Sequence, residues 1–474
     1  MNFEDDLFAE RNEFNFESKL IRNDNKNIYN RLCSIVDDAT FVMKVADIMP
    51  SLALIANERC GSWYIDRTKR KAYSAYFKST DGHMHIWDFN IRRNNLHLIP
   101  ILMSHNGCLI VDSTRKGKRI PDALSKTIPI WCCTVNRAVA TYAGYTQDEW
   151  DLDLHTLPSA VSRSEHAQIE ARLDGFVDKL LTSGVDMKHL VSQLKKPLRP
   201  IWFTPQSYDA LMESPPDFQD ASFCPVVCLS ASEAVESGYQ LRPGYLYVQG
   251  SADDEEAWAL GLTHLAFWKH RHDILTNSNE CERNVKSLVA RLKDSSLKNN
   301  DDEDDNDGTT RHYAFIKSTP LAIGDDRSGK PPQCWDTFNY VINCSQDEYE
   351  LNRSHKHYLH LPIPDGKKGQ IIFGACIQKA IDFVRDPILE NKKILVYCAT
   401  GKDHSVGILL SILIHYYTLD FELNTAEKPR VDKKMIQHQL VQIISNWEKA
   451  APSRVTLKRI NTHFMSHSSH DNPK

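Results

Sequence analysis

A loop between an apolar strand and an apolar helix near the C-terminus carries the most informative residue types in the chain. Residues 394–397 (Ile-Leu-Val-Tyr) lead into Cys398 and a run of small and polar residues, and apolar residues resume at Val406. A turn of this kind directs several backbone N–H groups and the positive end of the helix dipole at a phosphate group. The sequence therefore predicts a phosphate-binding loop that begins with a thiol and contains Lys402, Asp403 and His404.

This loop resembles the phosphate loop of cysteine-dependent phosphatases, in which a thiolate begins the loop and an arginine follows six residues later. Cys398 fills the first position, but His404 fills the second, and the preceding residue, usually histidine in phosphatases, is Tyr397. Imidazole cannot replace the bidentate phosphoryl clamp of arginine. We interpret the loop as a phosphate cradle adapted to another use. The alternative is that Cys398 is only a buried thiol at a strand end.

Segments before this loop indicate its fold. Phe338–Ser345 is typical of a buried strand, Tyr358–Asp365 follows it, and apolar residues recur at helical spacing over 373–384. This order resembles the dual-specificity phosphatases, whose general acid would correspond to Asp365, although Pro-Asp-Gly is also an ordinary turn. We therefore predict a C-terminal α/β domain of this kind, with a mostly parallel sheet and the loop at its carboxyl edge.

Length and composition set the domain organisation. The chain has 474 residues, 41% of them hydrophobic and 25% charged, as in soluble globular proteins of two or three domains. An acidic run at 301–308 cannot bury itself, so it is interpreted as a linker. The predicted division is an N-terminal α/β domain over 1–295, an acidic linker over 296–312, and the phosphatase-like domain over 313–474.

Several classes of protein are excluded by composition. No apolar run approaches the ~18 residues of a membrane span, and the acidic N-terminus is unlike a secretory signal. The 12 cysteines are scattered without a C-x-x-C pair, which favours reduced thiols over a disulfide framework or a zinc site. We expect a cytoplasmic protein without membrane partners, and a monomer.

Two polar loops in the N-terminal half could handle an anionic or hydroxylated substrate. The first contains Lys78, Asp81 and His83 within six positions, and a purely structural loop of these residue types is equally consistent with the sequence. The second follows the apolar run 108–111. It begins with Asp112, which could accept hydrogen bonds from ribose hydroxyls, and continues into a basic stretch that could hold a phosphate. It loosely resembles the phosphoribosyl-diphosphate loop of type I phosphoribosyltransferases, without that loop's second acid and Thr-Gly.

A third loop follows Tyr245–Gln249 and contains Asp253 and Asp254. Acidic residues at a helix start are usually favourable for the helix dipole, but two carboxylates could also bind Mg²⁺ together with phosphate oxygens. The layout echoes the Cys398 loop, and Phe223–Ser230 echoes Phe338–Ser345. One interpretation is that the N-terminal half is a degenerate relative of the C-terminal domain.

A net charge of −5 argues against indiscriminate nucleic-acid binding. Cations clustered at several places along the chain still permit specific contacts with an RNA backbone. Solvated surface faces are the alternative interpretation. The candidate RNA-binding residues are Arg92, Arg93, Arg115, Lys116, Lys118, Arg119, Lys195, Lys196, Arg199 and Arg454.

Taken together, these segments resemble the initiator-tRNA ribosyl-phosphate transferases of fungi and plants. The matching pieces are Phe77–His83, Arg92–Leu98, Ile110–Trp131, Lys196–Trp202, Tyr247–Trp268 and Tyr397–Gly407. The resemblance implies transfer of the 5-phosphoribosyl group of phosphoribosyl diphosphate to the ribose 2′-hydroxyl of a T-stem adenosine in initiator methionine tRNA. That modification keeps the tRNA out of elongation.

The resemblance also suggests roles for the candidate residues. The domain over 1–295 would be the transferase and tRNA-binding domain, and the clustered cations would contact tRNA. Lys402 and His404 would be cationic partners of a donor phosphate, Asp403 would orient a hydroxyl or hydrated Mg²⁺, and the base would be His83, Asp81 or Asp254. Asp253 and Asp254 would bind the expected Mg²⁺. The residues expected at the donor are Cys398, Ala399, Thr400, Gly401, Lys402, His404, Ser405, Val406 and Gly407, with Asp112 and Lys78.

Two other function classes compete with this one. A cysteine-dependent phosphatase acting on RNA or phosphoprotein would use Cys398 and Asp365, but the missing arginine opposes it. A non-catalytic RNA-binding protein with a phosphatase-like fold is opposed by the acidic and varied polar loops, which backbone binding does not require.

Overall fold

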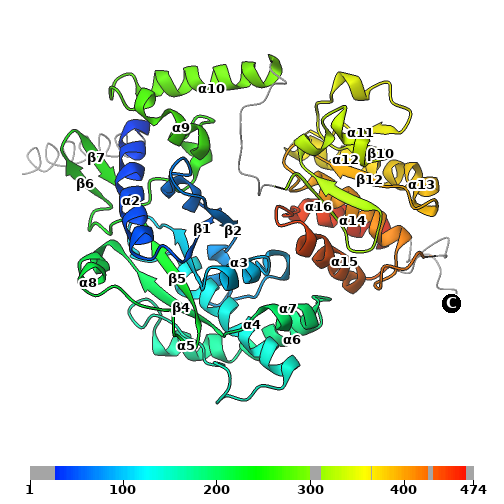
Figure 1. The fold of residues 1–474 in the computed structure, drawn as a ribbon. Helices are drawn as coiled ribbons and strands as arrows, with labels where there is room; N and C mark the ends of the chain where they lie inside the picture. Colours follow the sequence, from blue (N-terminus) through cyan, green and yellow to red (C-terminus); the bar gives the residue numbers. More distant parts are fainter. Residues whose placement is uncertain (1–26, 299–310, 365, 425–430, 466–474) are drawn as a thin grey trace, which may run out of the picture. The chain divides into compact units, whose positions relative to one another are not determined.

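The computed structural model describes residues 27–298, 311–364, 366–424 and 431–465. The chain forms two compact units (Figure 1). The first unit contains most of the chain up to residue 303. The second contains the chain from residue 304 together with two short segments, Ile91–His97 and Lys179–Asp186. The predicted linker and Asp365 fall largely or wholly outside the described residues, and the predicted domain boundaries stay a prediction.

The first unit is built on a five-stranded sheet in the order β2-β1-β3-β5-β4, and all neighbouring strands are parallel. Its strands are β1 (Ala53–Asn57), β2 (Tyr73–Ala75), β3 (Cys108–Asp112), β4 (Leu198–Phe203) and β5 (Cys224–Ser230). β1, β3 and β5 are buried along their whole length, as expected for parallel strands covered on both faces. The carboxyl ends of these strands therefore open on one edge of the sheet.

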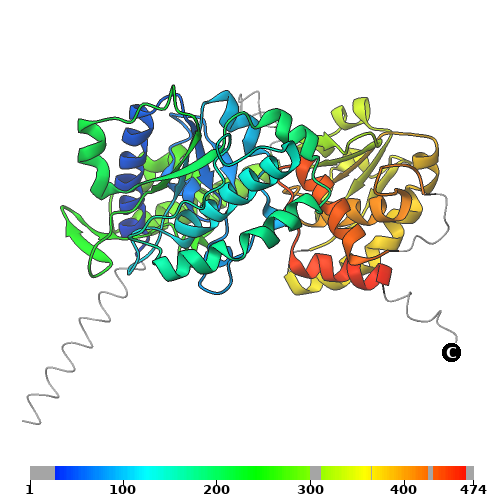
Figure 2. The same ribbon diagram turned by 90° about the horizontal axis from the view of Figure 1, so that it is seen from below.

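Helices cover both faces of this sheet. On one face, apolar side chains of β1, β3 and β5 pack with those of α2, α9 and α10 in a single core; α2 is dark blue in Figures 1 and 2. The helices of the N-terminal part of the chain are α2 (Ile28–Ile48), α3 (Leu98–Ser104), α4 (Ile128–Ala143), α5 (Arg163–Glu170), α6 (Leu173–Leu181), α7 (Met187–Gln193), α8 (Tyr208–Glu213), α9 (His264–Ile274) and α10 (Cys281–Lys298).

The strand predicted over 245–249 does not enter the parallel sheet. It is β7 (Tyr245–Val248), which pairs antiparallel with β6 (Tyr239–Arg242) as a separate ribbon. The two strands are joined by Pro243 and Gly244, the latter at a φ of 87°, and this tight turn reverses the chain. The predicted echo between the loop after residue 249 and the Cys398 loop is therefore wrong.

The second unit has a five-stranded sheet in the order β11-β10-β12-β9-β8, parallel except for the edge strand β8. This confirms the predicted mostly parallel α/β sheet, and α14 follows directly on the loop after β12. The strands are β8 (Tyr313–Phe315), β9 (Leu321–Gly324), β10 (Tyr340–Asn343), β11 (Tyr358–His360) and β12 (Ile394–Tyr397). The helices are α11 (Gln333–Thr337), α12 (Gly366–Phe383), α13 (Arg385–Leu389), α14 (His404–Tyr416), α15 (Lys433–Asn446) and α16 (Arg454–Met465).

The two sheets share a spatial order once β5 is matched with β9. Strands β2-β1-β3-β5 then correspond to β11-β10-β12-β9, although β5 comes late in its unit and β9 early, which is a cyclic permutation. Asp112 lies opposite Ser230 on β5, as Tyr397 lies opposite Gly324 on β9. Ser113 therefore occupies the position of Cys398. The loop that corresponds to the Cys398 loop is the one after β3.

Candidate functional site

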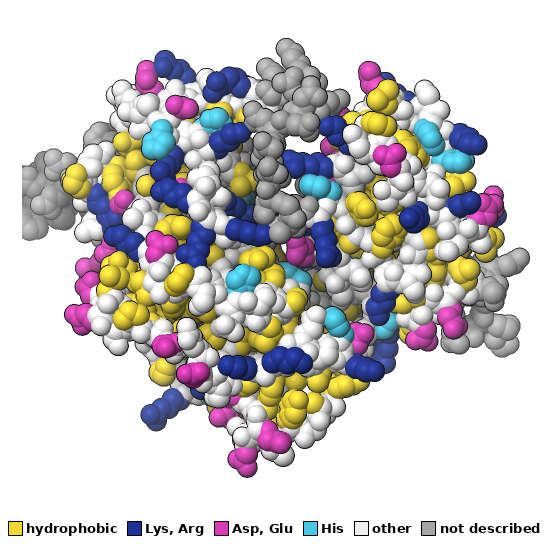
Figure 3. Space-filling view, in the orientation of Figure 1, with side chains coloured by type: hydrophobic (Ala, Val, Ile, Leu, Met, Phe, Trp, Pro, Cys, Tyr) yellow, Lys and Arg dark blue, Asp and Glu magenta, His cyan; other side chains and the backbone are white. Residues whose placement is uncertain are grey.

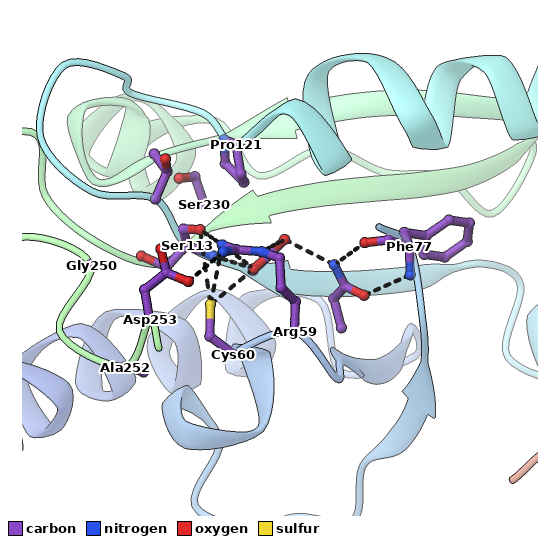
Figure 4. Close-up of polar contacts among 12 residues, drawn as sticks. Arg59, Cys60, Phe77, Ser113, Pro121, Ser230, Gly250, Ala252 and Asp253 are labelled. Atoms are coloured by element: carbon purple, nitrogen blue, oxygen red, sulfur yellow. Dashed lines mark hydrogen bonds and ion pairs between the residues drawn. The ribbon is translucent and has the colours of Figure 1, made fainter. Parts of the chain in front are cut away.

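Three loops meet at the carboxyl edge of the first sheet: residues 57–60 after β1, residues 112–119 after β3, and residues 249–254 after β7 (Figure 4). The chain runs from β1 outward to β2 and then back to β3 on the other side of β1. Ligands of open α/β sheets bind where the strand order reverses in this way, beyond the carboxyl ends of the strands. The polar residues of these loops are therefore at the position where a ligand site is expected.

Arg59 is the centre of the polar contacts in Figure 4. Its guanidinium contacts both carboxylate oxygens of Asp112, at 2.9 and 3.2 Å, and one oxygen of Asp253 at 2.6 Å. Asn57 donates a 2.9 Å hydrogen bond to Asp112, which is fully buried. Although burial works against its charge, the neighbouring Asp112 raises the pKa of Arg59, so the guanidinium stays charged.

Cys60 faces the same carboxylate. Its thiol lies 3.1 Å from Oδ1 of Asp112, and burial, reinforced by that negative charge, raises the thiol pKa well above its usual value. A neutral thiol is a weak hydrogen-bond donor and a poor nucleophile. Cys60 therefore contributes to holding Asp112 and is not arranged for covalent catalysis.

The loop after β3 is anchored through its carbonyl groups. The side-chain amide of Gln249 donates to the carbonyl oxygens of Thr114, Arg115 and Lys118, at 3.3, 3.2 and 2.8 Å. Gly250 approaches so closely that a Cβ there would lie 2.7 Å from the Thr114 backbone. Because C=O and N–H point in opposite directions across a planar trans peptide, the amides that follow these carbonyls are directed away from Gln249.

Side chains of this loop reach the third loop. Arg115 forms an ion pair with Asp253 at 2.9 Å and a second ion pair with Asp254. Asp112, Arg115, Asp253 and Asp254, which the sequence analysis assigned to two separate loops, are thus brought together around Arg59.

A buried hydrogen-bond chain supports the loop from behind. The Ser113 hydroxyl lies 2.5 Å from that of Ser232, which donates to Asp38 on α2 at 2.5 Å, and Tyr247 donates to Asp38 at 2.8 Å. Burial raises the pKa of Asp38 to about 8. The start of the loop is therefore tied to α2 through a carboxyl group that is neutral at pH 7.

The predicted Lys78–His83 loop forms a 3-10 turn (Ser79–Gly82) against the π-helical turn Ala123–Thr127. His83 lies 3.6 Å from the carboxylate of Asp122, to which Lys118 and Lys126 donate at 2.5 and 3.0 Å. Burial opposes ionisation of Asp122, but these hydrogen bonds outweigh it and lower its pKa. His83 is therefore placed beside an ionised carboxylate.

The other two predicted residues of this turn have structural contacts. Asp81 accepts a 3.3 Å hydrogen bond from Asn90, and the Lys78 carbonyl accepts one from Thr127 at 3.2 Å. The side chain of Lys78 is half-buried.

The predicted tRNA-binding cations fall into two groups. Arg199 is ion-paired with Asp151 and stacked on Phe223, and Lys196 donates to the Ala221 carbonyl, so these two stabilise the fold. Figure 3 shows Lys and Arg side chains in several separate groups on the face displayed. Arg92 and Arg93 lie in a half-buried 3-10 turn (Ile91–Arg93), and the exposed candidates are Arg115, Lys116, Lys118, Arg119, Lys195 and Arg454.

In the second unit, several polar groups of the loop after β12 accept hydrogen bonds from residues that follow α15. Trp447 and the Ala451 amide donate to the carbonyls of Gly401 and Lys402, at 2.8 and 2.9 Å, and the Ser453 amide donates to the Asp403 carboxylate at 2.9 Å. The buried Cys398 thiol lies 3.1 Å from the Ser405 hydroxyl.

The remaining positions of this loop divide between solvent and core. His404, Ser405, Val406 and Gly407 are buried at the start of α14, whereas Ala399, Thr400 and Lys402 are exposed. Lys402 is thus the cation of this loop that a phosphate could reach directly.

No group of three or more His, Cys, Asp or Glu side chains within the described ranges could hold a metal ion. The predicted ligands Asp253 and Asp254 are already ion-paired with arginines. The two carboxylates do not fit a resident cation site. The prediction that Asp253 and Asp254 bind Mg²⁺ therefore stays a prediction, and it applies to an ion that arrives bound to a phosphate ligand.

Sequence reasoning missed Asn57, Arg59, Gln249, Asp122 and Lys126. A signal existed for the first two, because the apolar run 52–56 ends in Asn-Glu-Arg-Cys-Gly. Gly61 follows as a close-packing position, where a Cβ would lie 2.1 Å from the Val111 carbonyl oxygen. No comparable pattern marks Gln249, whose role depends on the ribbon folding back onto the β3 loop.

Comparisons with known proteins cover both units. The family description "Rit1 N-terminal domain" matches residues 21–290, and "Rit1 DUSP-like domain" matches residues 357–464. The chain is 36% identical over 449 residues to an uncharacterized protein of Schizosaccharomyces pombe, covering 92% of this chain and 94% of that protein. It is 31% identical over 492 residues to the tRNA A64-2'-O-ribosylphosphate transferase of Saccharomyces cerevisiae, covering 94% of each.

Solved structures resemble the chain over about a third of its length. Human DUSP28 matches at 13% identity with a TM-score of 0.27, covering 34% of this chain and 97% of that one. The Yvh1 phosphatase domain of Chaetomium thermophilum matches at 17% identity with a TM-score of 0.26, covering 34% and 99%. Among the described residues, no helix is both long and apolar enough to span a membrane.

Proposed function

Because the chain belongs to the Rit1 family, matched along both of that family's domains, we propose that it is a tRNA 2′-O-ribosylphosphate transferase, a pentosyltransferase. The observation that carries the proposal is 31% identity to the S. cerevisiae transferase over 94% of both chains. The donor is phosphoribosyl diphosphate, and the acceptor is the 2′-hydroxyl of a T-stem adenosine of initiator methionine tRNA. The protein acts as a monomer in the cytoplasm.

The reaction sets clear requirements for the site. The bond between ribose C1 and the diphosphate oxygen breaks, a bond from C1 to the tRNA 2′-oxygen forms, the diphosphate departs and the 2′-hydroxyl loses its proton. Negative charge grows on the leaving diphosphate while C1 gains oxocarbenium character, so fixed cations beside the diphosphate contribute most. The edge of the first sheet supplies such a cation in Arg115, which is half exposed beside the buried pair of Arg59 and Asp112. Mg²⁺ accompanies the donor diphosphate as part of the substrate.

His83 is the best-placed of the three candidate bases. Asp254 is engaged by Arg115 and Asp81 accepts from Asn90, whereas His83 lies 3.6 Å from Asp122 and is about half exposed. A carboxylate beside an imidazole orients the ring and favours the protonated form that results from taking a proton. We therefore assign proton removal from the 2′-hydroxyl to His83, positioned by Asp122.

The second unit takes a phosphate without covalent chemistry. Its loop joins strand β12 to helix α14 and exposes Lys402, while Cys398 is buried against Ser405 and His404 is buried. We propose that Lys402 and the amides of Ala399–Gly401 contact a phosphate of the donor or of the tRNA. The A-form T-stem is itself recognised through its phosphates and 2′-hydroxyls, which suits the exposed cations of the β3 loop.

The test is a transfer assay with labelled phosphoribosyl diphosphate, Mg²⁺ and either initiator or elongator tRNA. Label on initiator tRNA alone supports the proposal, and chelation of Mg²⁺ should abolish it. No transfer, together with Cys398-dependent hydrolysis of a phosphoester, would overturn the proposal in favour of a phosphatase. Equal labelling of both tRNAs would retain the transferase and remove the initiator specificity.

A further inference from the structure

A cavity of about 380 Å³ opens beside the Arg59 centre, entirely within the first unit. It lies between the β3 loop, the ribbon of β6 and β7, and the first turn of α2. Its lining includes Arg31, Arg115 and Lys116, with Asp253, Tyr239 and Trp258. Small-molecule sites are typically clefts of about 300–1,000 Å³ with a few convergent polar groups. This cavity fits that size, and its charged lining consists of those three cations and the two carboxylates of Asp253 and Asp254.

Two of its cations are held close together and partly desolvated. Arg31 donates to the Ser251 carbonyl at 2.6 Å and lies over the Trp258 ring at 5.6 Å. Burial lowers the pKa of Arg31, and the positive charge of Arg115 lowers it further. Asp253 and Asp254 act in the opposite direction on Arg31, and a phosphate bound between the two arginines would take over that role from Asp254.

Lys116 is positioned by a specific feature of the ribbon. A Cβ on Gly238 would lie 2.7 Å from the Cβ of Lys116, so the lysine stem packs where only glycine leaves room. Gly238 has a φ of 81°, and Lys116 is itself exposed at the cavity wall. Gln249 holds the backbone on both sides of Lys116 by donating to the carbonyl oxygens of Arg115 and Lys118. The amides that follow these carbonyls therefore point away from Gln249. The loop thus presents a cation from an ordered backbone.

We propose that this cavity binds the diphosphate of a phosphorylated-sugar diphosphate, with Arg31, Arg115 and Lys116 as its cationic contacts. The assignment rests on the proposed function and deepens it, because it names the loop that receives the leaving group. Arg115 exchanges its ion pair with the exposed Asp254 for a phosphate oxygen. The Cys398 loop is the weaker candidate for this ligand, since among its predicted cations only Lys402 is exposed.

The direct test measures binding of magnesium pyrophosphate and of phosphoribosyl diphosphate to the full chain by titration calorimetry, without tRNA. Lys116→Glu and Arg31→Gln should each weaken binding of both ligands by at least about tenfold, the effect of losing one charge-assisted contact. The matched control is Arg283→Gln. It removes an exposed cation of α10 that is paired with Glu280, and the variant should bind as the wild type does. Circular dichroism and the thermal midpoint report whether each variant is folded.

Lys402→Ala distinguishes the two loops. If this variant loses pyrophosphate binding while folded Lys116→Glu and Arg31→Gln retain it, the diphosphate binds in the second unit and the inference is overturned. If Arg31→Gln fails to fold, Lys116→Glu decides alone, because Lys116 is exposed.

Failure of the site and failure of the proposed function give different results. Wild-type transfer to tRNA with unchanged pyrophosphate affinity in both cavity variants would overturn the site and leave the function standing. Absence of transfer by the wild type, with pyrophosphate binding that depends on Lys116, would overturn the function and support a diphosphate site.

Discussion

The loop after β3 and the loop after β12 occupy corresponding positions in their two sheets, yet they differ in which polar side chains are exposed and which are packed. Both loops are anchored through carbonyl oxygens, by Gln249 in the first and by Trp447 and the Ala451 amide in the second. In the first, the cationic side chains stay at the surface. In the second, Trp447 packs over Gly401, the Ser453 amide occupies Asp403, and His404 faces the core. Similar strand arrangements thus support a loop with several exposed cations in one unit and a more closely packed loop with one exposed lysine, Lys402, in the other.

The charge beneath each loop differs as well. Asp112, at the last position of β3, is a fully buried carboxylate paired with Arg59, whereas the corresponding Tyr397 is a buried aromatic residue. A buried ion pair has to be matched on both sides, since either charge alone would be strongly disfavoured. The loop after β3 therefore lies above a charge pair that must stay intact, whereas the loop after β12 lies above an aromatic side chain.

The largest expected effect comes from breaking that pair. Arg59→Met should lower the free energy of unfolding of the first unit by about 3–5 kcal/mol, because it leaves the Asp112 carboxylate buried without a partner. Urea denaturation followed by tryptophan fluorescence measures the change. Arg283→Met, which removes an exposed ion pair, should change it by less than about 0.5 kcal/mol.

Adding Asp112→Asn to Arg59→Met supplies the internal check. The double variant should recover part of the lost stability, since no unpaired charge remains. If the double variant is less stable than Arg59→Met alone, Asp112 contributes through some other contact, and the contrast between the two sheets is not one of buried charge.

Alanine substitution of one glycine with positive φ in each loop tests how tightly the two loops are packed. A Cβ on Gly401 would lie 2.9 Å from the Trp447 ring, whereas one on Gly117 would have no neighbour within 4 Å. Both alanine variants carry the backbone strain of a left-handed conformation, about 1 kcal/mol. Gly401→Ala should cost roughly 1–2 kcal/mol more, because the ring must move. Equal losses in thermal denaturation would mean that Trp447 yields freely and the second loop is not tightly packed.

The stability of the first unit should also depend on pH, through the Asp38 carboxyl group that supports the loop after β3. Burial raises the pKa of Asp38 to about 8, so between about pH 4 and pH 8 the unfolded chain has released a proton that the folded chain keeps. Stability therefore falls as the pH rises through that window, by up to about 1.4 kcal/mol per pH unit, and levels off above it. Asp38→Asn should flatten this slope in urea titrations at several pH values. A slope unchanged by the substitution would assign it to other groups.

Sequence patterns were enough to predict the second unit, because its phosphate loop is one continuous strand–loop–helix segment with a strong apolar contrast. They were insufficient for the first site, since Arg59 pairs with residues 53 and 194 positions away. Such contacts depend on strand order, which local periodicity does not encode. The ribbon of β6 and β7 shows the same limit: an apolar run such as Tyr245–Val248 suits either a ribbon or a sheet, and the Pro243-Gly244 turn was the discriminating feature.

The smallest effect is expected at Cys398, and it bears most directly on what the second loop does. Its thiol is buried against the Ser405 hydroxyl, a contact that serine can reproduce, and the clamp position holds a buried histidine. Cys398→Ser should therefore keep tRNA transfer within about threefold, whereas removal of a true covalent nucleophile costs on the order of 10⁴ or more in rate. Single-turnover transfer with labelled donor measures the difference, with Cys376→Ser on α12 as a matched buried-thiol control. A folded Cys398→Ser variant without transfer, beside an active Cys376→Ser, would make the thiol a participant in the chemistry and erase the functional contrast between the two loops.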